Sequence, residues 1–477
     1  EFDSECFGPF SSGRRAPPAR GGMRCLVVLA AVVACGAFKA DQARLGGRKV
    51  LGRAEASGRG GAVVAAPAQK SSAVTSTFNL AKNIIGSGVL ALPAGVAAFS
   101  DSRLALGPAV SLIVVLGVLS AYCFTLVGRA CAALGSRTYR GAWERAVGED
   151  SGWLITLLCV FKCLTGCLAY TIILGDTGTS LARTYVGGPL GTIFGRRDAL
   201  LGILGASVLL PLALLESLAA LAPASLLGLA GMLYTTAFCV LRACDGTYAA
   251  GGRLRAALPV ARLPVFGNAV DGPSALVLVS MLATAYVAHY NAAKYYDELE
   301  DRSQFNAVVA GGFGLAIAVF SAVTVAAFFT FGGASAGFIL NSYASTDALA
   351  AAARAAVGVS VACTYPLLFA GLRDYVYEMA PSLRRFRTPL TAGLVATTVA
   401  AGIVLTDLGF VCAFGGAVLG SLVIYVIPTK IVLSAQAKGA MKLSKPELLL
   451  CRGLHVLGIG LAALGGAVTL LKQFGRL

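Results

Sequence analysis

The stretch NLAKNIIGSGVLALP, residues 79–93, is the most informative part of this chain. It is apolar enough for a membrane helix, yet Gly86-Ser87-Gly88 interrupts it and Pro93 follows. Each interior glycine costs about 1 kcal/mol of helix stability relative to alanine, and backbone at membrane depth leaves a helix only where it faces protein or a wet cavity. The stretch therefore predicts a broken helix at a binding site for a small polar solute. The alternative is a glycine-kinked helix packed on a neighbour.

Apolar residues dominate the rest of the sequence. They make up 57% of the 477 residues, and charged residues only 13%, against roughly 25% in soluble domains; the mean hydropathy is +0.77. Stretches of about 20 apolar residues, long enough to cross a bilayer, recur along the chain. We therefore predict an all-α polytopic protein embedded in the lipid bilayer. Its eleven spans are expected at residues 74–98, 106–131, 152–180, 198–215, 221–242, 274–297, 305–331, 348–372, 389–406, 409–433 and 449–471.

The charge of the chain fits a membrane protein rather than a nucleic-acid-binding one. The formal net charge is +16, and basic loops of membrane proteins mark the cytoplasmic side. The distribution of lysine and arginine favours an N-terminus on that side. Most of the 13 cysteines fall inside expected helices, so they indicate packing rather than a disulfide framework or a metal site.

A second interruption lies in the sixth expected span. Residues 274–301 read SALVLVSMLATAYVAHYNAAKYYDELED, with the polar run His289-Tyr290-Asn291 inside the apolar stretch. Polar groups at that depth face a cavity or a partner helix; for His289 a packing role is the alternative. The two interrupted spans, one and six, lie five helices apart. That spacing predicts an inverted repeat of five plus five helices, followed by one more, with a site between the halves.

The ordered motifs resemble the amino acid/auxin permease family, also called the amino acid transporter transmembrane family. The family pattern N-x-x-x-x-x-x-G-S-G-x-L-x-L-P matches residues 79–93, where the chain is most similar to the proton-coupled branch. YTIILGD (170–176), AHYNAAKYYDEL (288–299) and CTYPLLFAGLRD (363–374) follow in the third, sixth and eighth spans. The resemblance implies a LeuT-type fold with helices 1 and 6 broken. It also implies secondary active transport of amino acids by alternating access, with no enzymatic activity and no cofactor.

The resemblance also implies a substrate site. It places the substrate carboxylate on the open backbone of four residues of the first span: Ile85, Gly86, Ser87 and Gly88. It places the substrate ammonium at the break of the sixth span, around three residues: His289, Tyr290 and Asn291. Because neither break contains an acidic side chain, small neutral amino acids are the expected substrates.

Lys82, one helical turn before Gly86, bears on the driving ion. Sodium-coupled relatives commonly carry asparagine there, which ligates sodium together with a hydroxyl of helix 8; Thr364 is the candidate hydroxyl here. An ammonium repels a metal cation, so we expect a proton gradient rather than sodium to drive transport, with Lys82 or His289 changing protonation. Proton-coupled relatives often carry histidine where this chain has Asn79. Lys82 as a fixed structural cation is the alternative.

Three further sequence features bear on rival functions. Lys162 is expected to be structural, with a cavity-facing or snorkelling side chain as the alternatives, and Asp176 is expected to belong to a gate. The acidic run at 297–301 suggests the magnesium site of an intramembrane transferase, but such a site needs a second acidic cluster that the chain lacks. A third class is an amino acid sensor that signals to a protein partner, which the sequence does not identify.

The N-terminal part indicates targeting. Residues 1–22 lie upstream of Met23. Residues 23–37 have the arginine, apolar run and small residues of a signal peptide, and the basic, acid-poor residues 38–70 resemble a transit peptide and are expected to be disordered. The two together resemble the presequence of algae with secondary plastids and predict a plastid membrane. The alternatives are a secretory signal with a disordered tail or a misassigned start, and then an endomembrane or the plasma membrane. The expected transporter domain is 71–477.

Overall fold

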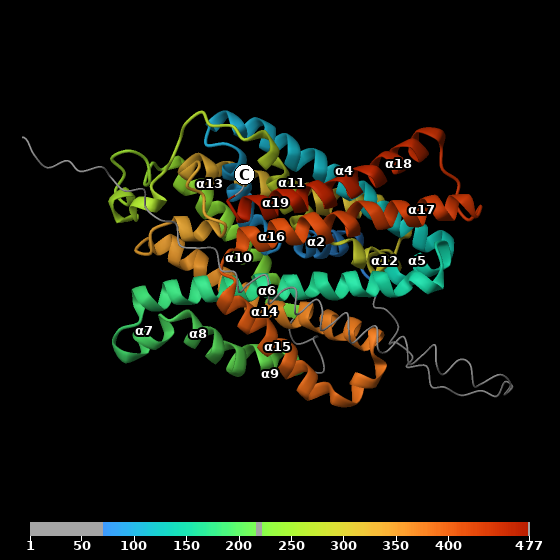
Figure 1. Ribbon diagram of the computed structural model, residues 1–477, viewed down its shortest axis with the longest axis horizontal. Coiled ribbons are helices and arrows are strands. Elements are labelled where there is room, and N and C mark those ends of the chain that lie inside the picture. The colour runs from blue at the N-terminus through green and yellow to red at the C-terminus, as the bar shows by residue number, and fades with distance from the viewer. Residues whose placement is uncertain (1–69, 216–221, 476–477) are drawn as a thin grey trace, which may run out of the picture.

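Helices account for nearly all of the described structure, a computed structural model that describes residues 70–215 and 222–475 (Figure 1). The predicted segments 1–22 and 23–37 lie outside the described residues, and so does 38–70 apart from Lys70. Within the described residues, ten helical segments are long and apolar enough to cross a membrane. A further helix, apolar over Gly228–Cys244, corresponds to the span predicted at 221–242. The polytopic all-α prediction is therefore confirmed.

The spans differ in how regular they are. Six are continuous: α4 (Leu106–Leu134), α6 (Gly152–Tyr185), α10 (Ala222–Cys244), α13 (Phe305–Phe331), α14 (Ala348–Met379) and α15 (Arg387–Val404). Three contain a π-helical segment: α8 (Arg197–Leu204) with α9 (Leu210–Leu214), α16 (Leu408–Gly415) with α17 (Ile427–Ala437), and α18 (Lys445–Gly460) with α19 (Gly466–Gln473). Short helices α5 (Tyr139–Ala146) and α7 (Gly188–Phe194) flank α6.

The first span is broken where its sequence predicts. Helix α2 (Ala73–Ile84) ends before Gly86, whose backbone is extended, and a 3-10 turn (Ser87–Ala91) leads into α3 (Leu92–Phe99). Pro93 lies in the first turn of α3, where its missing N–H leaves no helical bond unmade. The two glycines and the proline thus mark the break and the restart.

The sixth span is broken without glycine or proline. Helix α11 (Ala275–Ala285) ends at Tyr286, and α12 (Ala292–Glu298) follows a 3-10 turn at His289–Asn291. The Tyr286 hydroxyl donates to the carbonyl of Ile113 at 2.9 Å, and Nε2 of His289 lies 2.9 Å from the carbonyl of Ser120. Both carbonyls belong to α4. Side-chain bonds to a neighbouring helix therefore hold this break open.

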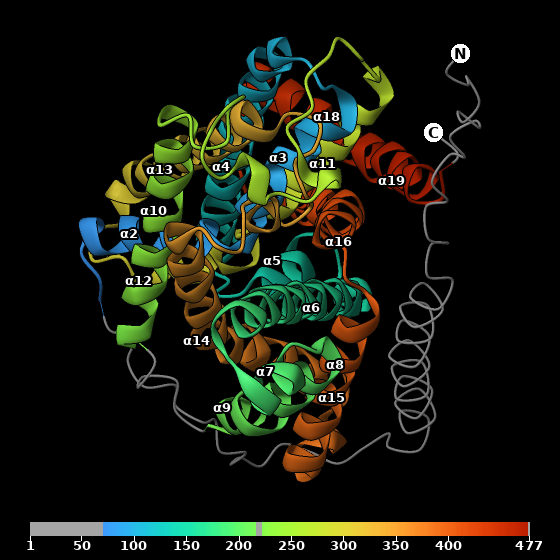
Figure 2. The same cartoon turned by 90° about the vertical axis from the view of Figure 1, so that its left-hand side faces the viewer.

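Helices five places apart in the order of spans lie against one another. The pair α3 and α11 is in contact, and so are α4 with α13, α6 with α14, and α8 with α15. Figure 2 shows α6 and α14 side by side when the bundle is viewed end-on. Such pairing of corresponding helices is what the predicted inverted repeat requires.

The bundle has two ends, which position the site. Helices α5 and α12 and the turn between α17 and α18 gather at one of them, here called the α5 end (Figure 1). Helix α7, the start of α8 and the long loop after α10 gather at the other, here called the α7 end. The two broken helices meet between these ends.

Candidate functional site

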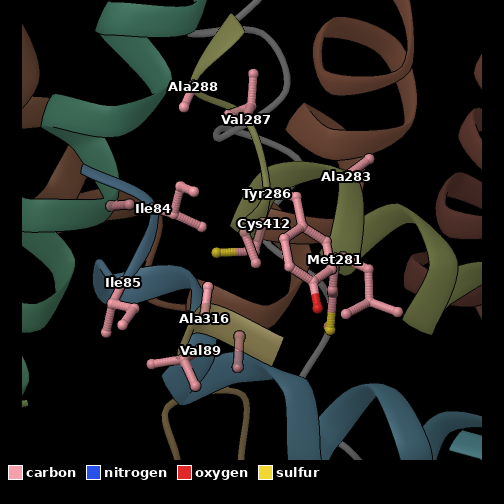
Figure 3. Close-up of a cluster of buried hydrophobic side chains, with 14 of the residues drawn as sticks. Ile84, Ile85, Val89, Met281, Ala283, Tyr286, Val287, Ala288, Ala316 and Cys412 are labelled. Atoms are coloured by element: carbon pink, nitrogen blue, oxygen red, sulfur yellow. The ribbon is translucent and has the colours of Figure 1, made fainter. Parts of the chain in front are cut away.

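A cavity of about 100 Å³ lies where the two broken helices meet. Its walls come from the break after α2, the break after α11, the middle of α6, and parts of α14 and α16. Figure 3 shows the two broken segments beside each other, with Ile84 and Val89 of the first near Tyr286 and Val287 of the second. Four residues predicted to bind substrate line this cavity: Gly86, Ser87, Gly88 and Tyr290. Three do not: Ile85, His289 and Asn291.

The backbone of the first break is only partly open. The N–H of Ile85 donates to Ala81 at 2.7 Å, and the N–H of Gly86 donates to Ile84 at 2.8 Å. The next two amides, at Ser87 and Gly88, begin a new helical segment, and the first N–H groups of a helix have no helical carbonyl to bond. Of the four residues predicted to bind a carboxylate, these two are therefore the ones whose amides are not used by the preceding helix.

The opening in the sixth span lies earlier than predicted. The non-helical residues are Tyr286–Ala288, whereas His289–Asn291 forms the first turn of the second half. The cavity is lined there by Thr284, Ala285 and Val287, and the Thr284 hydroxyl donates to the carbonyl of Cys412 at 2.6 Å. The opening that the sixth span contributes to the cavity therefore precedes the predicted run His289–Asn291.

His289 lies in the protein core instead. Its side chain is 0% exposed. The ring contacts Phe124 and Phe313 edge-on, at centroid distances of 5.6 and 6.3 Å. With Nε2 on the carbonyl of Ser120, the ring faces α4 and α13. The structure thus places His289 as a packing histidine, the alternative that the sequence left open.

Lys162 of α6 also lines the cavity. It is the one Asp, Glu, Lys, Arg or His among the lining residues, within the described part of the chain. Cys412 of α16 and Tyr290 of the sixth span line the same cavity. The cavity is therefore positively charged whenever this amine carries its proton.

Larger cavities lie at the ends of the bundle. One at the α5 end has a volume of about 500 Å³ and shares Tyr290 with the central cavity. The one at the α7 end, about 510 Å³, is lined by four arginines and Asp176, and shares no described residue with the central cavity. The central cavity therefore lies next to the α5 end, separated from it by the side chain of Tyr290.

A family model described as transmembrane amino acid transporter protein matches residues 69–471. The chain belongs to this family. Amino acid transporter AVT6A of Arabidopsis thaliana is 26% identical over 422 residues, which cover 83% of this chain and 88% of that protein. Vacuolar amino acid transporter 2 of Saccharomyces cerevisiae is 23% identical over 409 residues, 82% of each chain. Putative sodium-coupled neutral amino acid transporter 11 of Danio rerio is 23% identical over 406 residues, 82% and 86% of the chains.

Two solved structures are similar in their chain path. The inward-facing conformation of Mhp1 has a TM-score of 0.49 and 13% identity, covering 86% of this chain and 91% of that chain. MhsT in complex with L-phenylalanine has a TM-score of 0.48 and 15% identity, covering 86% and 99%. Family membership confirms the predicted resemblance, and it places this family member among transporters rather than enzymes.

None of the four predicted ion-coupling residues of this family member lines the central cavity. Lys82 lies in the last turn of α2, and neither it nor Thr364 lines the central cavity. The Thr364 hydroxyl donates to the carbonyl of Ser360 at 2.7 Å. Asn79 is exposed, and its carbonyl accepts a hydrogen bond from Tyr295.

The acidic run after α12 is used in surface ion pairs. Asp297 accepts from Arg302 at 2.7 Å, and Glu298 lies 3.8 Å from Lys294. Hydrogen bonds from Ser303 hold the pKa of the Asp301 carboxyl below its usual range. No group of three or more metal-ligating side chains occurs among the described residues. These pairings are those expected for a solvated run beside the membrane.

Sequence reasoning preferred a structural role for Lys162 and gave a cavity-facing side chain only as an alternative. The available signal was a single lysine in the middle of an otherwise apolar span, which is costly unless it faces a cavity or a partner. The neighbouring cysteines 159, 163 and 167 mark a buried face of α6. The direction of the Lys162 side chain relative to that face depends on how the helices pack, so the sequence alone did not give it.

Proposed function

We propose that this protein is a secondary active transporter that carries small neutral amino acids with protons and without sodium. The observation that carries the proposal is the cavity shared by both helix breaks, which contains a lysine and no acidic side chain among the described residues. The names of the relatives support amino acids as the substrate class.

The size and charge of the cavity support a small neutral substrate. Its volume of about 100 Å³ is below the roughly 300–1,000 Å³ of pockets for drug-sized ligands. The Lys162 ammonium repels a cationic side chain, and no lining carboxylate offsets that repulsion. Basic amino acids and polyamines are therefore disfavoured.

The same charge supports protons over sodium. Sodium needs several oxygen ligands in place of its water, and a nearby ammonium opposes it. Two lysines flank the first break, Lys82 in α2 and Lys162 across the cavity. Either amine can bind and release a proton, a property that arginine lacks.

Orientation and location form part of the proposal. With the N-terminus on the cytoplasmic side, as the basic loops favour, the α5 end faces the cytoplasm. Tyr290 then separates the site from the cytoplasm, and the conformation faces inward. For the host membrane we retain the plastid membrane suggested by residues 23–70. Imaging a fluorescent fusion of the full chain against plastid and vacuolar markers tests that location.

Uptake of a radiolabelled pool of neutral amino acids into proteoliposomes tests the function. We expect uptake to follow an imposed proton gradient, to remain unchanged when sodium replaces potassium, and to be unaffected by lysine or spermidine as competitors. Uptake that requires sodium would overturn the coupling. Binding without uptake would identify the protein as a sensor.

A further inference from the structure

Lys162 is charged, central and without a counter-charge in its cavity. It comes from the middle of α6, which contacts α14 and α16, and it lines the same cavity as the open segment Gly86–Gly88. In the described structure no acidic side chain lies within 4 Å of its ammonium. A charged side chain at membrane depth is costly unless a partner compensates it. The cavity therefore lacks an anion.

The other groups facing this amine are neutral. The titratable residues that line the cavity with Lys162 are Tyr170 of the same helix, Tyr290 of the sixth span and Cys412 of α16. The lining residues of α14 and the first span, Leu368 and Asn83 among them, do not titrate. No neighbour of these kinds supplies a fixed negative charge, so the charge of the site changes with Lys162 itself.

An amino acid supplies the missing charge. Its carboxylate pairs with an ammonium through charge-assisted hydrogen bonds, and the cavity is small enough to bring the two together. The zwitterion's own ammonium then points away from Lys162, toward the open carbonyls of the sixth span. This orientation follows from repulsion between like charges.

We propose that Lys162 binds the substrate carboxylate and that its ammonium proton is the proton transported with the substrate. The inference rests on the proposed transport function and assigns its coupling to one side chain. The carboxylate favours the ammonium form, and the ammonium favours carboxylate binding, so proton and substrate strengthen each other's binding by linkage.

Lys82 is the competing assignment. It lies one turn before the break, but it does not line the cavity and so has no path to the substrate carboxylate in this conformation. A purely structural role for Lys162 predicts a different experimental result from a role in substrate and proton binding. Its replacement would lower stability without altering which substrates bind or which ion drives them.

The test compares Lys162→Met and Lys162→Arg with the control Lys430→Met, which removes an exposed lysine of α17. Two quantities are measured on the full chain. The first is displacement of labelled L-alanine by unlabelled L-alanine and by L-alaninamide, in detergent. The second is uptake of labelled L-alanine into proteoliposomes with and without a proton gradient.

For the wild type and Lys430→Met we expect L-alaninamide to compete at least about ten-fold more weakly than L-alanine, because the amide cannot form the charged hydrogen bond. Lys162→Met should lose this discrimination and the effect of the gradient. Lys162→Arg, which keeps the charge but cannot release a proton, should retain the discrimination and lose the gradient effect. If Lys162→Met does not fold, the result for Lys162→Arg decides the test.

Two results would overturn the inference. One is Lys162→Met that still prefers the acid over the amide and still responds to the gradient. The other is loss of gradient-driven uptake in Lys82→Ala while Lys162→Met retains it. Absence of uptake by the wild type would instead count against the transport function, and the detergent measurement would still decide the carboxylate contact.

Discussion

Asp176 of α6 forms an ion pair with Arg197 of α8 at the α7 end of the bundle. The two side chains are only 12% and 18% exposed. Asn341 donates to the other oxygen of Asp176 at 2.7 Å, and Arg197 also donates to the carbonyl of Gly402 in α15 at 3.0 Å. This pair therefore joins four segments beside the α7-end cavity, and we predict that it acts as a gate there.

Replacing Asp176 by asparagine should loosen the α7 end. The variant leaves Arg197 without its counter-charge, and loss of a charged hydrogen bond costs about 1.5–3 kcal/mol. A cysteine placed at Ser180, which lines the α7-end cavity, should then react with a membrane-impermeant thiol reagent about ten-fold faster. The measurement is the labelling rate, compared with a parent lacking the added cysteine because Cys244 is exposed.

The adjacent ion pair provides the control for this gate. Arg196 and Asp198 also form an ion pair at the start of α8, but they are 69% and 51% exposed. Exposed pairs contribute about 0–1 kcal/mol, so Asp198→Asn should leave the labelling rate unchanged. Equal rates in the two variants would remove the gating role of Asp176.

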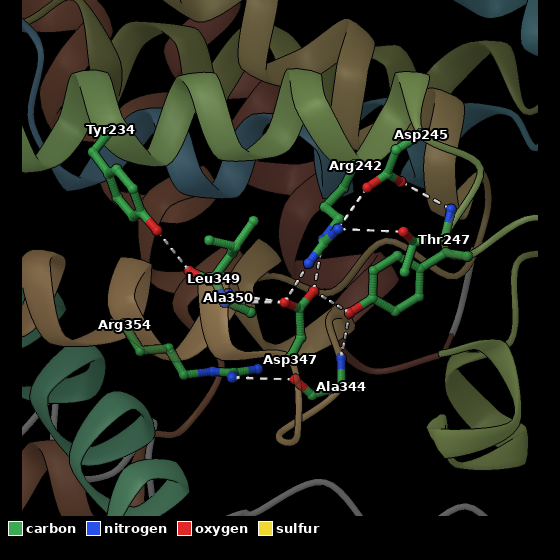
Figure 4. A network of polar contacts seen from close by, with 10 residues as sticks. Tyr234, Arg242, Asp245, Thr247, Ala344, Asp347, Leu349, Ala350 and Arg354 are labelled. Carbon is green, nitrogen blue, oxygen red and sulfur yellow. Dashed lines mark hydrogen bonds and ion pairs between the residues drawn. The ribbon is translucent and has the colours of Figure 1, made fainter. Parts of the chain in front are cut away.

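Asp347 and Arg242 form the buried ion pair of the same end (Figure 4). Two hydrogen bonds of 2.8 and 2.7 Å join them, and Asp347 also caps α14 through the amide of Leu349. Asp347→Ala removes the buried partner of a guanidinium that is 5% exposed and leaves it only Asp245 and the Thr247 hydroxyl, so we expect a loss of about 3 kcal/mol. The melting temperature of the purified protein in detergent measures it.

A double variant separates charge from packing at this pair. Arg242→Met combined with Asp347→Leu removes both charges, and apolar replacements of buried pairs are often neutral. We expect it to regain most of the lost stability. Asp245→Ala removes a partner of Arg242 that is 26% exposed and should cost less than Asp347→Ala. A double variant as unstable as Asp347→Ala would refute this account.

The sequence was informative where local chemistry determines structure. Gly86 and Gly88 marked the first break because glycine weakens any helix, wherever it packs. The sixth break was predicted too late, at His289, because it depends on bonds from Tyr286 and His289 to carbonyls of α4. Such bonds exist only after the helices pack.

The same reason explains the partial success at the site. Residues 86–88, which the glycine interruption and the family resemblance together predicted as part of the site, line the cavity. For His289 and for Lys162 the structure gives the alternative to the preferred role: the histidine lies in the core and the lysine lines the cavity. Which polar side chain faces a cavity depends on how each helix is rotated, and the apolar faces of spans this hydrophobic do not specify that rotation.

Gly416 should tolerate no side chain. A Cβ placed there would lie 1.7 Å from the carbonyl oxygen of Ser280 in α11, so Gly416→Ala must push span 10 away from the sixth span. Overpacking costs about 1–3 kcal/mol or more, which we expect as a lower melting temperature and slower uptake. Gly107→Ala in α4, where a Cβ would meet no atom within 4 Å, is the control. An unchanged melting temperature for Gly416→Ala would contradict this packing.

Tyr290 should limit access to the site from the α5 end. Its side chain lines both the central cavity and the α5-end cavity, so Tyr290→Ala should join them. Cys412 is a native reporter, because it lines the central cavity and is only 2% exposed. We expect maleimide to modify Cys412 several-fold faster in Tyr290→Ala than in the wild type, measured on the Cys412 peptide by mass spectrometry. Tyr290→Phe keeps the ring and should react like the wild type, so a rise shared by both variants would assign the effect to the lost hydroxyl rather than to an opened passage.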